Sequence, residues 1–103
     1  MKDYQTKIKK FCKNNNLESP AEHRVLDLMS EVGEVAKEIL KMSDYGRQPV
    51  KYRSEIKNEI GDVLFSLITI ANSFDIDLEE ALKIVLDKYK KRLKKGSAVS
   101  END

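Results

Sequence analysis

Two short acidic motifs in the middle of the chain contain the residues best suited to chemistry. They share the pattern acid-x-Gly-acid and are formed by Glu31 with Glu34 and by Glu59 with Asp62. Residues three apart share one face of a helix, so each motif presents two carboxylates to one spot. Two such pairs facing each other would form a cage of oxygen ligands, which is the kind of site that Mg²⁺ prefers.

Both motifs carry energetic penalties that call for a compensating cause. Like charges one turn apart destabilise a helix by a few tenths of a kcal/mol. A glycine inside a helix costs roughly 1 kcal/mol more, but lets a backbone or a ligand approach closely. Gly33 and Gly61 therefore favour a metal site over the alternative, which is a pair of solvated acidic helix faces.

Other charged residues indicate what a bound metal would do. Glu38 continues the acidic stripe of the first motif, and an acid outside the ligand set can accept a proton from an attacking water. Lys88, Lys91 and Arg92 lie in a basic segment and could contact phosphate oxygens, although cations near a helix C-terminus are commonly only solvated. Together these residues suit hydrolysis of a phosphoric anhydride.

Two other metal chemistries fit the sequence poorly. A zinc site needs nitrogen or sulfur ligands, but His23 is the only histidine and Cys12 the only cysteine. We expect His23 at the surface and Cys12 in the core. A di-iron bundle pairs glutamate with histidine three residues later, and neither motif has that histidine.

Apolar periodicity and helix-end signals predict an all-α, four-helix bundle. Ser19-Pro20-Ala21-Glu22 and Asp77-Leu78-Glu79-Glu80 are both predicted capping boxes, and Gly96 is a typical helix terminator. A turn is expected at 14–16 and a loop at 44–49. The predicted helices cover about 3–13, 20–43, 52–74 and 78–95. We expect one domain over 1–96 and a flexible tail over 97–103.

The third predicted helix is apolar almost all round between Val63 and Ala71. Such a helix must be covered on every side, and three companion helices of this size cannot do that within one chain. The sequence therefore predicts a homodimer in which third helices pack together.

Composition limits the partners and the compartment. The 103 residues carry a formal net charge of +1, which argues against a nucleic-acid binder. The N-terminal residues lack a secretory signal, and no segment is apolar enough to span a bilayer. A single cysteine excludes an intramolecular disulfide. We expect a cytoplasmic protein with no membrane or nucleic-acid partner.

The two motifs and their spacing resemble those of the MazG-like nucleoside triphosphate pyrophosphohydrolases. The similar part runs from the second predicted helix to Lys95. The resemblance implies an all-α fold assembled as a dimer or a dimer of dimers. It also implies cleavage of a (d)NTP between its α and β phosphates, with Mg²⁺ or Mn²⁺, to the monophosphate and pyrophosphate, as in nucleotide-pool house-cleaning.

The same resemblance implies roles for single residues. Metal would lie on the residues Glu31, Glu34, Glu59 and Asp62, and one of these or Glu38 would orient the attacking water. Lys88 and Arg92 match basic positions that approach the phosphates. Several relatives have an asparagine where this chain has Leu86, which leaves nucleotide selectivity open. Asn72 is a candidate substrate contact or, alternatively, a buried helix-end cap.

Two other functions remain as alternatives. Phosphoribosyl-ATP pyrophosphohydrolases have a related acidic motif, but theirs runs into a tyrosine and a histidine, whereas Asp62 is followed by Val63 and Leu64. A non-catalytic helical dimer, serving as a binding or regulatory module, would pair its acids and lysines across the interface.

Overall fold

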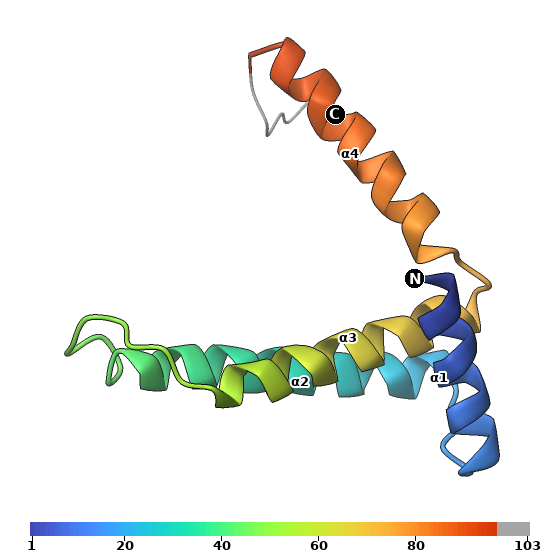
Figure 1. Ribbon diagram of the computed structural model, residues 1–103, viewed down its shortest axis with the longest axis horizontal. Coiled ribbons are helices and arrows are strands. Elements are labelled where there is room, and N and C mark those ends of the chain that lie inside the picture. Colours follow the sequence, from blue (N-terminus) through green and yellow to red (C-terminus); the bar gives the residue numbers. More distant parts are fainter. Residues whose placement is uncertain (97–103) are drawn as a thin grey trace.

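The computed structural model describes residues 1–96, and this part of the chain is all-α, without a strand. Its helices are α1 (Lys2–Asn14), α2 (Ala21–Met42), α3 (Glu55–Ser73) and α4 (Leu78–Lys94) (Figure 1). The predicted all-α class and the order of the four helices are confirmed. The predicted tail at 97–103 lies outside the described residues.

Helix ends follow the sequence signals at α4 but not at α2. The Asp77 carboxylate accepts hydrogen bonds from the backbone N–H groups of Glu79 (3.0 Å) and Glu80 (3.4 Å), as expected of an N-cap. The predicted Ser19 cap of α2 is wrong. Pro20 is the N-cap residue, and its extended backbone (ψ 153°) delays the helix start, so Ser19 lies outside the helix.

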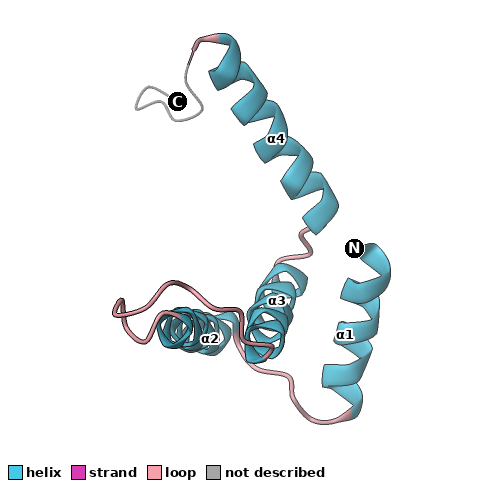
Figure 2. Ribbon diagram, turned by 60° about the vertical axis from the view of Figure 1, so that its left-hand side comes forward, coloured by secondary structure: helices cyan, strands magenta, loops and turns pink. Residues whose placement is uncertain are grey.

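Helix α3 is the central element of the packing. It lies between α2 on one side and α1 on the other (Figure 2). α2 and α3 run antiparallel along each other (Figure 1). The rings of Phe11 and Phe65 meet edge to face, with centroids 6.5 Å apart. Among residues 1–96, the buried apolar side chains come from α1 and α3: Cys12, Ile56, Ile68 and Ala71. The apolar core therefore follows α3.

A single polar side chain of α1 connects the end of α3 to the start of α4. The buried Gln5 amide donates to the Asn72 side chain (3.1 Å) and the Ile76 carbonyl (2.8 Å). Its oxygen accepts from the N–H of Leu78 (3.1 Å), and Asn72 donates back to the Gln5 carbonyl (2.9 Å). Burying these amide groups is inexpensive because they satisfy one another.

Helix α4 does not join the packing of the other three helices. It extends away from them (Figure 1), and its apolar side chains Leu82, Ile84 and Leu93 are each about 60% exposed. The radius of gyration is 17.1 Å, against about 13 Å for a compact chain of this length. One chain by itself therefore leaves its predicted bundle open.

The apolar segment of α3 is only partly covered within the chain. Ile68 is 2% exposed, whereas Leu64 and Leu67 are 45% and 40% exposed. Leu64 also lines an apolar hollow between α3 and α1, together with Tyr4 and Gly61. The exposure of Leu64 and Leu67 agrees with the prediction that one chain cannot cover α3 on every side.

The structure also bears on the expectations for Cys12, for His23 and for a membrane-spanning helix. Cys12 is buried, as expected of a small core residue, and His23 is exposed. Within residues 1–96, no helix has the length and apolar character to cross a bilayer.

The Gln5 network yields a prediction about stability. Gln5→Leu keeps the size of the side chain but leaves buried amide partners unsatisfied, so it should lower the free energy of unfolding by about 1–3 kcal/mol. Urea titration followed by circular dichroism measures this change. Thr6→Ala, at the exposed neighbouring position, should stay within about 0.5 kcal/mol of wild type. Equal effects of the two substitutions would contradict the role given to Gln5.

Candidate metal centre

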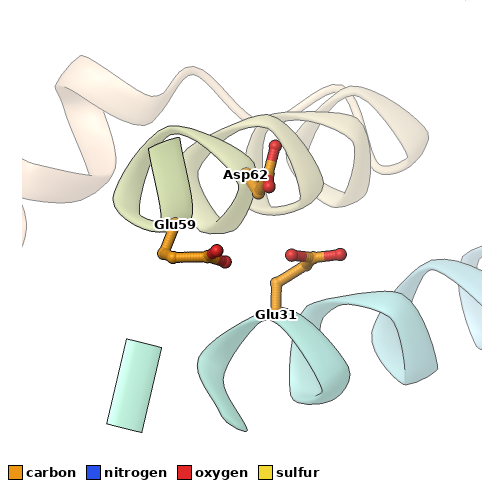
Figure 3. A group of neighbouring side chains, drawn as sticks. All are labelled: Glu31, Glu59 and Asp62. Carbon is orange, nitrogen blue, oxygen red and sulfur yellow. The ribbon is translucent and has the colours of Figure 1, made fainter. Parts of the chain in front are cut away.

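Three carboxylates from two helices meet on the seam between α2 and α3. Glu31 comes from α2, and Glu59 and Asp62 come from α3, with one oxygen of each lying within 4.8 Å of the others. Figure 3 shows Glu31 pointing across the seam toward the other two side chains. We call these three residues the carboxylate cluster. Its charge, its oxygen donors and the absence of sulfur or nitrogen donors fit a hard divalent cation.

The cluster is electrostatically unfavourable without a cation. The pKa of Glu31 is raised above 4.5, first because partial burial removes water from its carboxylate and then because of the charges of Asp62, Glu59, Glu34 and Asp27. Among residues 1–96, the ion pairs that the structure describes do not include a member of the cluster. A bound cation would relieve this repulsion.

The other two acids of the predicted site lie outside the cluster. Glu34 is exposed one turn further along α2, close enough for its charge to raise the pKa of Glu31. Glu38 is buried, and its carboxylate accepts a hydrogen bond from the Arg53 guanidinium at 2.5 Å. Of the two, only Glu34 is open to solvent.

The predicted substrate-binding residues are not brought to the cluster within one chain. Lys88, Lys91 and Arg92 lie on α4, which extends away from α2 and α3 (Figure 1). Two of these cations flank the Tyr89 ring, with Lys88 Nζ 5.5 Å and Arg92 Cζ 5.3 Å from its centroid. The side-chain amide of Asn72 forms hydrogen bonds with Gln5. These bonds fit the alternative prediction for Asn72, a cap at the end of its helix.

Gly33 and Gly61 have no close neighbour in the described part of the chain. A Cβ atom added at Gly33 or Gly61 would meet no atom within 4 Å, so neither glycine allows a close approach inside the chain. Gly61 follows Glu59 by two residues, which places it on nearly the opposite face of α3, where it lines the apolar hollow. The close approach of a backbone or a ligand that the sequence predicts is therefore not made by the described part of this chain, and for a ligand or a second chain it stays a prediction.

Sequence and structure comparisons agree on the family of this chain. The profile of the MazG nucleotide pyrophosphohydrolase domain matches residues 21–97. The chain belongs to the MazG domain family. The matched range contains α2, α3 and α4 and therefore the whole carboxylate cluster.

Two solved structures of Bacillus proteins are similar to this chain. The crystal structure of the Bacillus-conserved MazG protein, described as a nucleotide pyrophosphohydrolase, superposes with a TM-score of 0.72 at 34% identity, over 85% of this chain and 86% of that one. The solved structure of YpjD from Bacillus subtilis gives the same score and identity, over 85% of this chain and 92% of that one.

A curated sequence relative covers less of the chain. The uncharacterized protein YpjD of Bacillus subtilis (strain 168) is 46% identical over 68 residues, which is 63% of this chain and 60% of the relative. The aligned part thus spans under two thirds of the relative's own length.

Sequence reasoning missed two residues that organise this MazG domain. Arg53 lies just before α3 and pairs with Glu38, and Gln5 holds the α3–α4 connection. For Arg53 a signal existed: in an antiparallel helix pair, a cation near the start of one helix can meet an acid near the end of the other. For Gln5 no signal existed, since its partners are mainly backbone groups more than 70 residues away.

The raised pKa of Glu31 predicts how the metal-free MazG domain responds to pH. Well below its ordinary pKa of 4.5, the Glu31 carboxyl is protonated in both the folded and the unfolded chain. As pH rises from 4.5 through the raised pKa, the unfolded chain loses its proton first, so wild type loses stability. Glu31→Gln should remove this loss and be the more stable protein at pH 7 in EDTA.

Urea unfolding at pH 4 and pH 7 tests this expectation. Asp87→Asn, at an exposed position of α4, is the matched control and should change neither value. A Glu31→Gln protein less stable than wild type at pH 7 would contradict the repulsion in the cluster.

Proposed function

We propose that this MazG domain is a magnesium-dependent pyrophosphohydrolase that cleaves a nucleoside triphosphate between the α and β phosphates. The products are the nucleoside monophosphate and pyrophosphate. The observation that carries the proposal is the meeting of Glu31, Glu59 and Asp62 within 4.8 Å, without a cationic partner in the described ion pairs. Membership in the MazG family supports the same reaction.

The acidic residues have two roles in this proposal. The cluster, with Glu34 as a fourth carboxylate, holds Mg²⁺, and Mn²⁺ can replace it. When bound, the metal neutralises phosphate charge and lowers the pKa of a coordinated water. Glu34 and Asp62 are the more exposed of these acids, and whichever of the two is not bound to the metal accepts the proton of the attacking water.

The basic residues of α4 act on the phosphates in an assembled homodimer. α4 has an exposed apolar side that includes Leu82, Leu86 and Leu93, and α3 exposes Leu64 and Leu67. We propose that a second copy of the chain covers these surfaces, because exposed apolar area of this extent favours association. Packing of α4 against a helix pair then brings basic residues to the phosphate oxygens: Lys88, Lys91 and Arg92.

The first experiment measures pyrophosphate release from a panel of canonical and modified (d)NTPs, with and without Mg²⁺. Glu59→Gln and Asp62→Asn remove one charge each at constant shape. Each should lower kcat/KM by about 100-fold or more, since even partners outside the ligand shell are worth 10–100-fold. Glu34→Ala should also lose activity, and Asp87→Ala should keep it.

Two results would contradict the proposed reaction. One is a folded, Mg²⁺-loaded protein that releases no pyrophosphate from any nucleotide of the panel, which would favour a non-catalytic binding module. The other is full activity of Glu59→Gln or Asp62→Asn.

The proposed homodimer has its own test in solution. Light scattering after size-exclusion chromatography should give a mass of at least two chains of 11.9 kDa. Leu86→Glu introduces a charge into the apolar side of α4 and should shift the protein toward one chain at micromolar concentration. Asp87→Lys, a charge change at an exposed position of α4 away from this apolar side, should leave the mass unchanged. A monomeric wild type would refute the assembly.

A further inference from the structure

We infer that the ion pair between Glu38 and Arg53 fixes the register of α2 against α3 and thereby holds the carboxylate cluster together. Both are positioning residues in this view, and Glu38 does not accept the proton of the attacking water. The inference rests on the proposed function in one respect, namely that the cluster binds a divalent cation.

The ion pair is the most buried of those within residues 1–96. The Glu38 side chain is 8% exposed, and its Oε1 lies 2.5 Å from Nε of Arg53. The pair of Arg47 with Asp44, in the same loop, is 3.6 Å long, and its side chains are 73% and 58% exposed. The Arg53 side chain is 43% exposed, so the buried member of the pair is Glu38. Removing Arg53 would leave the charge of the buried Glu38 carboxylate uncompensated, whereas a fully exposed pair contributes little.

The ion pair lies on the same seam as the cluster. Glu38 follows Glu31 by seven residues, which is two turns along the same face of α2 and about 10.5 Å. Arg53 precedes Glu59 by six residues. Since α2 and α3 run antiparallel (Figure 1), both steps lead from the cluster toward the α2–α3 loop. The ion pair therefore joins the two helices close to the loop that connects them.

The loop between α2 and α3 does little by itself to fix the position of α3 along α2. It covers residues 43–54, and one backbone hydrogen bond, from Lys51 N–H to the Met42 carbonyl at 2.8 Å, connects its far end to α2. Arg53 follows that bond, and its carbonyl accepts from the N–H of Ile56 at 3.2 Å. Its backbone is thus part of the first turn of α3, and its side chain ties that turn to α2.

A change of register would disperse the cluster. Sliding α3 along α2 by one helical turn moves it about 5.4 Å. That distance exceeds the 4.8 Å within which the three oxygens now lie, so Glu31 could no longer share a cation with Glu59 and Asp62. The position of the ion pair and the binding of metal are therefore linked.

The experiment measures binding of Mn²⁺ alone by electron paramagnetic resonance. Arg53→Gln and Glu38→Gln should each weaken Mn²⁺ binding about 10–100-fold, the effect typical of residues that orient metal ligands. Exchanging the charges with Glu38→Arg and Arg53→Glu together should restore most of the binding. Arg47→Gln is the matched control and should bind Mn²⁺ like wild type.

Kinetics with Mg²⁺ separate positioning from proton transfer. A positioning role predicts that a large excess of Mg²⁺ recovers much of the activity of Glu38→Gln. It also predicts that the charge exchange is active, although it has no carboxylate at position 38. Unchanged Mn²⁺ affinity in Glu38→Gln, together with a kcat that excess metal does not recover, would overturn the inference in favour of Glu38 as proton acceptor.

A structural measurement keeps the inference testable if a variant folds poorly or if wild type binds no metal. NMR cross-peaks between side chains of α2 and α3 report the register directly, and Arg53→Lys preserves the charge with a smaller change. Arg53→Gln should lose or shift these cross-peaks, and Arg53→Lys should retain most of them. Absence of Mn²⁺ binding by wild type would refute the proposed function, whereas an unaltered register in Arg53→Gln would refute this inference alone.

Discussion

The antiparallel contact of α2 with α3 is the constraint on which the rest of the molecule depends. It brings Glu31 from one helix to Glu59 and Asp62 from the other, and the spacing within the two acidic motifs would not form a cluster without it. The contact combines a repulsive region, the cluster, with an attractive one, the ion pair of Glu38 and Arg53. Bringing like charges together costs free energy when no cation is bound, and the apolar burial along α3 offsets that cost.

Helix α4 illustrates how incomplete a single chain of this kind is. It is a regular helix with a formed N-cap at Asp77 and a glycine at the expected end, Gly96 with φ +88°. Local signals thus suffice to form it, but its apolar side finds no cover among residues 1–96. The end signals at Asp77 and Gly96 thus define α4 as a helix, but they do not determine what its apolar side packs against.

Much of the fold could be predicted because its signals are local. The order of the helices, the cap at Asp77 and the pairing of the two acidic motifs follow from spacing alone. The cap at Ser19 failed because the extended backbone of Pro20 keeps it out of the helix. The roles of Gly61, Gln5 and Arg53 depend on which helix lies opposite, and periodicity does not contain that information.

Gln5 has a consequence for how this domain can diversify. The family profile begins at residue 21, after α1, yet α1 contacts the start of α4 through the hydrogen bond from the Leu78 N–H to Gln5 and through the ion pair of Lys2 with Asp77. The N-terminal helix α1 can therefore influence the direction in which α4 leaves the helix pair. Changes at Gln5 would alter the contact between α1 and α4 while the acidic seam of α2 and α3 stays intact, so the direction of α4 and the carboxylate cluster can change independently.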